Sequence, residues 1–82
     1  MDVELSRHAR EVLKERGLDP GWVARTLLSP EATEEHPDGT VHFLARLPER
    51  EGRVLRVVTA AGSSPPSVVT AFLDRRMKGR LP

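Results

Sequence analysis

The spacing of hydrophobic positions changes once along this chain, near residue 31. Before that point apolar residues recur every three or four positions, which is typical of helices that bury one side. After it apolar and polar residues alternate, as they do in half-buried strands. The pattern therefore predicts two N-terminal helices followed by strands.

The first helix is predicted over residues 5–16. Ser6 is a suitable N-cap, because its hydroxyl can accept a hydrogen bond from a first-turn amide. Gly17 follows as the left-handed residue that ends such a helix, and Arg16 is expected to serve the last helical carbonyls. The apolar stripe is formed by Leu5, Ala9, Val12 and Leu13.

The second helix begins with Asp19 as N-cap and Pro20 as its first residue, and it ends at Ser29-Pro30. Trp22, the only tryptophan, is expected to project away from the buried face. That buried face is expected to comprise Val23, Ala24, Leu27 and Leu28.

Four strands are predicted, over residues 31–36, 40–47, 54–60 and 67–73. The first two are joined by the tight turn Pro37-Asp38-Gly39, with Gly39 in the left-handed position. The order predicts an α+β fold in which two N-terminal helices pack on one face of a four-stranded antiparallel sheet. The expected core residues are Leu13, Val23, Leu27, Phe43, Leu55 and Val57.

A chain of 82 residues makes one domain, here expected over residues 1–73 with a basic C-terminal tail over 74–82. It has no Cys, no apolar run long enough for a membrane span and no signal-peptide pattern. We therefore expect a cytoplasmic protein without a membrane partner. Asn, Gln and Cys are absent and 11 of the 13 basic residues are Arg, which favours a thermophilic or GC-rich source.

The net charge of +1 hides an asymmetry between the two halves of the chain. Residues 1–41 carry five basic and nine acidic residues, whereas residues 42–82 carry eight basic and three acidic ones. The basic half could meet phosphate, and Arg75 and Arg76 in the tail are candidate RNA contacts. The alternative is a solvated surface with no ligand.

Known catalytic motifs are missing. The sequence has no phosphate-binding glycine loop and no Gly-x-Ser-x-Gly elbow. The three histidines, His8, His36 and His42, show no metal-ligand spacing, so we expect neither a metal nor a cofactor. Acid–base and cationic chemistry from His and Arg is what remains.

His8 is the strongest candidate for acid–base chemistry. It lies in the first helical turn, where the helix dipole disfavours imidazolium and keeps the ring neutral. Its position beside the apolar stripe predicts a half-buried side chain. Such a histidine suits a general base, or it locks the helix to the sheet through a hydrogen bond.

A second set of candidates lies on the predicted sheet. His42, Arg46 and Arg56 are expected on the face away from the helices, where they could bind phosphates or form an exposed charged face. Trp22 is a candidate partner contact or base-stacking platform, or it covers part of its own fold. An interaction surface is also suggested by the sheet face that retains Leu44, Val54 and Val58.

Several segments resemble those of one family. Ser6-Arg7-His8-Ala9, Glu15-Arg16-Gly17-Leu18 and Leu28-Ser29-Pro30-Glu31 follow its pattern, as do the strand segments 54–58 and 68–72. The sequence is similar to a small bacterial domain-of-unknown-function family placed with the RelE/BrnT-like toxins of toxin–antitoxin systems. The likeness covers about residues 5–73.

The resemblance implies the same α+β fold and a metal-independent endoribonuclease with His8 as catalytic residue. RNA and an antitoxin-like protein would be its partners. Association with a second copy of the chain is expected separately, from an exposed Trp22, the apolar sheet face and the basic tail. Phe72 stands where members often have Tyr, and the nearly neutral charge departs from the basic character of these toxins. The alternative is a non-catalytic protein-interaction module, a degenerate relative of that family.

Overall fold

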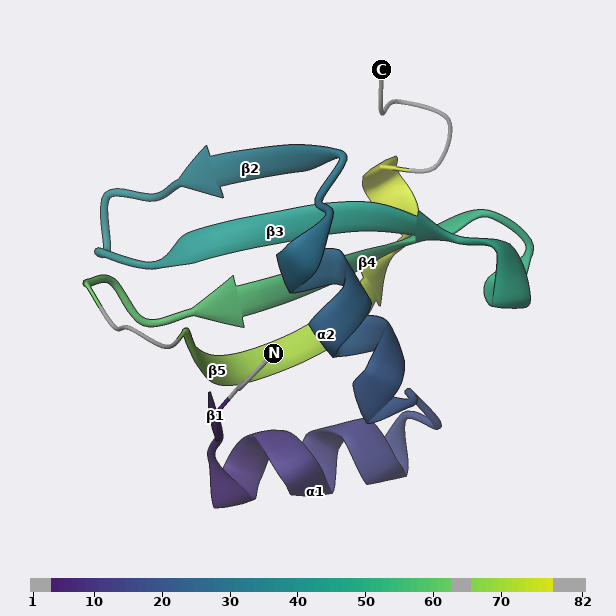
Figure 1. Cartoon of the computed structure of the whole chain (residues 1–82), viewed down its shortest axis with the longest axis horizontal. Coiled ribbons are helices and arrows are strands. Elements are labelled where there is room, and N and C mark those ends of the chain that lie inside the picture. Colours follow the sequence, from purple (N-terminus) through teal and green to yellow (C-terminus); the bar gives the residue numbers. More distant parts are fainter. Residues whose placement is uncertain (1–3, 63–65, 78–82) are drawn as a thin grey trace.

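Two short helices lie across one face of an open sheet, as Figure 1 shows. The structure is a computed structural model that describes residues 4–62 and 66–77. The helices are α1 (Arg7–Glu15) and α2 (Pro20–Leu28). The strands are β1 (Glu4–Leu5), β2 (Ala32–Glu35), β3 (Val41–Leu47), β4 (Arg53–Thr59) and β5 (Ser67–Asp74), with 3-10 turns η1 (Pro48–Arg50) and η2 (Arg75–Met77).

The helix ends follow the predicted capping chemistry. Ser6 Oγ accepts from the amide of Ala9 at 3.0 Å, and Asp19 Oδ1 accepts from the amide of Gly21 at 2.7 Å. Pro20 is the first residue of α2, a position at which an N–H group has no acceptor within the helix, so the absence of one costs nothing. Both predicted N-caps are therefore confirmed.

The sheet has the strand order β1-β5-β4-β3-β2. Strands β2 to β5 are antiparallel neighbours, so the predicted α+β fold of two helices on a four-stranded antiparallel sheet is confirmed. The two-residue strand β1 is an addition that the sequence pattern did not predict. It pairs in parallel with the start of β5, Glu4 beside Ser67 and Leu5 beside Val68.

The core lies between the helices and the sheet. Five of the six predicted core residues are buried there, and Phe43 is half-buried against the same cluster. Ala9 and Leu13 of α1 and Val23 of α2 share one buried cluster with inward residues of β4 and β5, such as Leu55 and Val68. Arg16 differs from prediction, since its Nη1 donates to the carbonyl of Ala71 on β5 at 2.7 Å. It therefore joins α1 to the edge of the sheet.

The buried face of α2 is rotated from the predicted one. Leu28 is 67% exposed, whereas Thr26 is 1% exposed. Thr26 can be buried because its hydroxyl donates to the carbonyl of Trp22 at 2.8 Å. Trp22 does not project away, because it is half-buried and packs against the core. The predicted burial of Leu28 and projection of Trp22 are both wrong.

The face of the sheet away from the helices carries its own small core. Leu44 and Val54 are fully buried there, with Ala32 and Met77 packed against them. Val58 on the same face is 7% exposed. The expectation that this face offers exposed apolar residues to a partner is therefore wrong, because the protein covers them itself.

The C-terminal region of the described chain remains attached to the sheet. Asp74 is the last residue of β5 and is 4% exposed, and η2 packs against β4. Residues 63–65 of the predicted turn and residues 78–82 of the predicted tail lie outside the described residues.

Candidate functional site

His42, Arg46 and Arg56 do project from one face of the sheet, as predicted. The β3–β4 register places His42 beside Val58 and Leu44 beside Arg56. The intervening residues of both strands, such as Phe43 and Val57, pack on the helix side. Alternation along a strand therefore directs the three polar side chains to the face away from the helices.

Arg56 is the centre of a buried polar network on this face. Its Nε donates to Asp74 Oδ2 at 2.8 Å, and its Nη1 donates to Glu34 Oε1 at 2.8 Å and to His42 Nδ1 at 2.9 Å. The residue is 7% exposed. Burial alone would lower the pKa of Arg56, but the two carboxylates outweigh it and raise the pKa. The guanidinium is thus held by groups of the protein itself.

The turn end of the β2–β3 hairpin extends this network. The rings of His36 and His42 stack with centroids 3.6 Å apart and 13° between their planes. His42 Nε2 lies 3.1 Å from Thr40 Oγ1, and that hydroxyl donates to Asp38 Oδ1 at 2.6 Å. Because His42 Nδ1 accepts from Arg56, the neutral ring carries its proton on Nε2 and donates it to Thr40.

These contacts shift the acid–base equilibria of the network. Burial is the main reason that the pKa of His42 is lowered, with His36 and Arg56 adding charge repulsion. The hydrogen bonds from Arg56 and His36 lower the pKa of Glu34. Both shifts favour a neutral His42 beside a charged Glu34 at neutral pH.

The linear spacing of the histidines did not reveal this cluster. Glu34 lies directly opposite His42 in the β2–β3 register, and His36 follows two residues after Glu34 on the same face. One ligand atom from each of these residues lies within 4.8 Å of the others. The signal could have been found by pairing the two predicted strands through the tight turn.

His8 lies elsewhere. It is exposed in the first turn of α1, so its predicted half-burial is wrong. The buried stripe of α1 runs through Ala9, Val12 and Leu13, one helical position away. The sheet separates His8 from Arg56, because α1 covers one face and the Arg56 side chain lies on the other.

The remaining predicted arginines are partly engaged. Arg46 Nη1 lies 3.8 Å from Glu31 Oε1, and the Arg46 amide donates to Glu31 Oε2 at 2.8 Å. Arg76 is largely exposed and reaches Asp74 Oδ1 at 3.6 Å. Arg75 differs, since it lines a groove on the helix side of the sheet.

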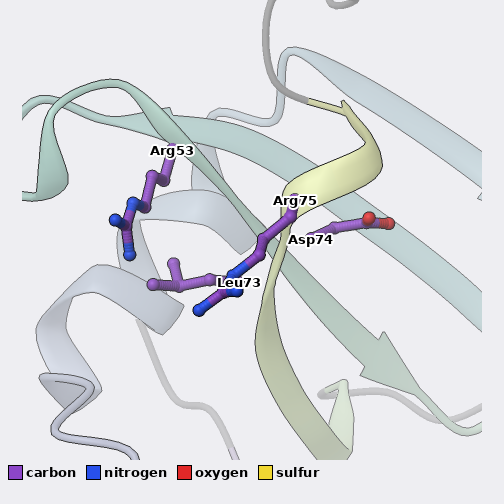
Figure 2. A pocket seen from close by; sticks show the side chains of 4 residues that line it. All are labelled: Arg53, Leu73, Asp74 and Arg75. Carbon is purple, nitrogen blue, oxygen red and sulfur yellow. The ribbon is translucent and has the colours of Figure 1, made fainter.

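Figure 2 shows a hollow that adjoins this groove, lined by Arg53, Leu73, Asp74 and Arg75. Arg53, Leu73 and Arg75 point to one side of the sheet, while Asp74 points to the other. The groove next to that hollow shares Arg53, Leu73 and Arg75 with it, and we call it the arginine groove. It has a volume of about 300 Å³ and is lined by Arg16, Leu18, Arg50, Arg53, Phe72, Leu73 and Arg75.

The lining of the arginine groove itself has four guanidinium side chains and no carboxylate, and Asp74 lines the adjoining hollow. Arg16 donates to the carbonyl of Ala71, and Arg50 donates to that of Gly17 at 3.3 Å. Backbone carbonyls leave the positive charge in place. None of the four forms an ion pair with another residue in the described part of the chain.

Two further acidic residues lie beside the groove. Glu49 and Glu51 line a neighbouring hollow together with Arg50 and Arg53. Glu49 is already engaged, because Arg25 donates to both of its oxygens at 2.7 and 2.8 Å and lowers its pKa to about 2. Only Arg75 of this groove was predicted as a phosphate contact, because the four arginines come from parts of the chain that lie far apart in sequence.

Among the described residues, no helix has the length and apolar character needed to span a bilayer. No curated protein and no solved structure matches the chain significantly. The sequence model of a family described as a domain of unknown function, DUF4258, matches residues 5–73. That stretch and the two residues after it contain both helices, the antiparallel strands and the lining of the arginine groove. The chain therefore belongs to the DUF4258 family.

Proposed function

We propose that this domain binds RNA through the arginine groove. The observation that carries the proposal is the convergence of Arg16, Arg50, Arg53 and Arg75 on one hollow without a carboxylate in its lining. Like charges drawn together on a folded surface repel one another, and an anionic ligand relieves that repulsion. A phosphodiester backbone supplies such anions at regular intervals.

The residues that line the groove are also chemically suited to bind a nucleic acid. The planar guanidinium donates two parallel hydrogen bonds to a phosphate, which fixes its orientation. Leu18, Phe72 and Leu73 give the groove an apolar wall. A base could stack on part of Phe72, whose ring already lies 5.9 Å from the Arg16 guanidinium carbon. Single-stranded RNA presents both phosphate and an unpaired base to such a surface.

The resemblance to RelE/BrnT-like toxins supports RNA as the polyanion and extends the proposal to cleavage. In this hypothesis His8 takes or gives a proton, and the RNA supplies its own 2′-hydroxyl as nucleophile, so no metal is needed. His8 is exposed and therefore accessible to a bound strand. It lies about 12 Å along α1 from Arg16, at 1.5 Å per residue.

Binding is tested by titrating purified protein into a fluorescent single-stranded RNA at several salt concentrations. Arg53→Gln and Arg75→Gln should each weaken binding and reduce the salt slope by about one, since one phosphate contact is lost. Arg10→Gln is the matched control, because Arg10 is exposed on α1 outside the groove. Equal affinity for wild type and the Arg53→Gln/Arg75→Gln double variant would disprove the proposal.

Cleavage is tested separately, with the same RNA in the presence of a chelator. General acid–base catalysis contributes about 10²–10⁴-fold, so His8→Ala should lose at least the lower factor while the circular dichroism spectrum stays unchanged. Binding without cleavage would retain the RNA-binding function and reject the catalytic role of His8. The roles predicted for His42, Arg46, Arg56 and Arg76 in RNA binding are tested by the same titration.

The competing function is a non-catalytic protein-interaction module that binds an antitoxin-like protein or a second copy. Failure of the wild type to bind RNA would favour it. Concentration-dependent sedimentation tests the homodimer directly. We favour RNA over a protein partner, because the arginine groove is cationic and the apolar residues of the outer sheet face are buried.

A further inference from the structure

The outer face of the β2–β3 hairpin gathers three side chains that transition metals prefer. Glu34 and His36 lie two residues apart on β2 and just beyond it, and His42 faces Glu34 across the register. Their ligand atoms lie within 4.8 Å of one another. The three residues are half-buried, so solvent can reach them while the protein restricts their motion.

We propose that Glu34, His36 and His42 bind a divalent transition-metal ion of the zinc class. Two imidazole nitrogens and one carboxylate oxygen are a typical ligand set for such an ion, and water supplies a fourth ligand. Glu34 Oε1 lies 3.0 Å from His36 Nε2. Two ligand atoms about 2.1 Å from a tetrahedral ion are about 3.4 Å apart, so this pair would have to separate by only about 0.4 Å. This proposal is independent of RNA binding in the arginine groove.

The network already presents two of these atoms to a cation. Arg56 Nη1 lies between Glu34 Oε1 at 2.8 Å and His42 Nδ1 at 2.9 Å. A metal ion would take the place of that guanidinium nitrogen. His36, whose ring stacks on His42, would turn its Nε2 from Glu34 toward the ion.

The contacts of the other ring nitrogen of His42 also suit a metal-bound histidine. A ligating histidine commonly donates its other ring N–H to a polar group that fixes its tautomer and orientation. His42 Nε2 lies 3.1 Å from Thr40 Oγ1, and Thr40 is held in turn by Asp38 at 2.6 Å. Coordination through Nδ1 would leave this chain from His42 to Asp38 intact.

The local charge also favours a cation. Glu34, Asp38 and Asp74 supply three carboxylates, against the single buried guanidinium of Arg56. Arg76 reaches Asp74 at 3.6 Å, but its side chain is 88% exposed and water screens its charge. A divalent ion would compensate the remaining negative charge.

The experiment titrates Zn²⁺ into untagged protein by calorimetry and follows the histidine ring signals by NMR. We expect binding of one ion, with the signals of His36 and His42 shifting together and those of His8 unchanged. His36→Asn should weaken binding at least 10-fold, and His8→Asn is the matched control that should bind like wild type. Thr40→Val should weaken binding about 10–100-fold by removing the orienting contact.

Absence of saturable binding by the wild type would overturn the proposal. So would equal affinity for wild type and His36→Asn, or loss of binding in His8→Asn. His36 is partly exposed on the edge of the hairpin, so its variant should fold, and an unchanged amide NMR spectrum verifies this. Co²⁺ provides a second readout, since a four-coordinate site gives a visible absorption band that His36→Asn should lose.

Discussion

Arg56 Nε and Asp74 Oδ2 lie 2.8 Å apart, and both residues are almost completely shielded from solvent. The pair joins the middle of β4 to the last residue of β5. Burial of two charges is unfavourable, and their mutual attraction offsets it only when the other polar atoms are also satisfied. Glu34 and His42 meet that condition by accepting from the second guanidinium nitrogen.

Removal of one partner should therefore be strongly destabilising. Asp74→Asn should lower the free energy of unfolding by about 3 kcal/mol, because it leaves the buried Arg56 charge with less compensation. Urea denaturation at pH 7 measures this change. The matched control is Glu49→Gln, which disrupts the exposed pair with Arg25 and should have a much smaller effect. Similar losses in both variants would contradict the importance of burial.

Stability should also fall in acid. Burial alone would raise the pKa of Asp74, but hydrogen bonds from Arg56 and the Arg76 amide outweigh it and lower the pKa. The unfolded chain therefore takes up this proton first, and below about pH 4 each further decrease in pH favours unfolding. Urea denaturation from pH 7 to pH 2.5 should show this loss. A curve for Asp74→Asn as steep as that of wild type would refute the assignment.

Local chemistry made most of the fold predictable. Asp19 and Pro20 mark the start of α2 through capping and a fixed φ angle, whatever packs around them. Gly39 has φ +89°, so the tight turn that pairs β2 with β3 could be placed from the sequence. The exposure of Leu28 could not be predicted, because the face that α2 buries is decided by how the helix packs on the sheet.

The candidate sites were less predictable for a related reason. The arginine groove brings together Arg16 after α1, the nearby Arg50 and Arg53, and Arg75 of η2, three parts of the chain that lie far apart in sequence. The Glu34–His42 contact depends on strand register, which spacing along one strand does not show. The common face of His42 and Arg56 was predictable, because it needs only alternation along each strand.

Two neighbouring leucines of α2 provide a direct test of the observed helix orientation. Leu27 is 7% exposed and Leu28 is 67% exposed. Leu27→Ala should lower the free energy of unfolding by about 2–5 kcal/mol. Leu28→Ala should change it by no more than about 0.5 kcal/mol. Chemical denaturation of both variants measures the difference, and the reverse order would show that α2 packs through its predicted face.

The fluorescence of Trp22 tests the same helix packing in the wild-type protein. Because its indole is half-buried against the core, its fluorescence maximum should lie at shorter wavelength than in the unfolded chain. Denaturant should shift the maximum to longer wavelength in step with loss of circular dichroism, as two-state unfolding requires. An emission maximum that does not move on unfolding would indicate a fully hydrated Trp22.

The bond from Arg16 to Ala71 has a consequence for how the protein behaves in a crowded solution. β1 pairs with β5 only at Ser67 and Val68, and Val69, the next residue of β5, is exposed. Exposed strand edges recruit strands from other molecules and seed aggregates. Arg16 occupies an edge carbonyl with a bulky cation. An incoming strand would have to displace Arg16 before it could pair with that carbonyl, so this single hydrogen bond disfavours aggregation through β5.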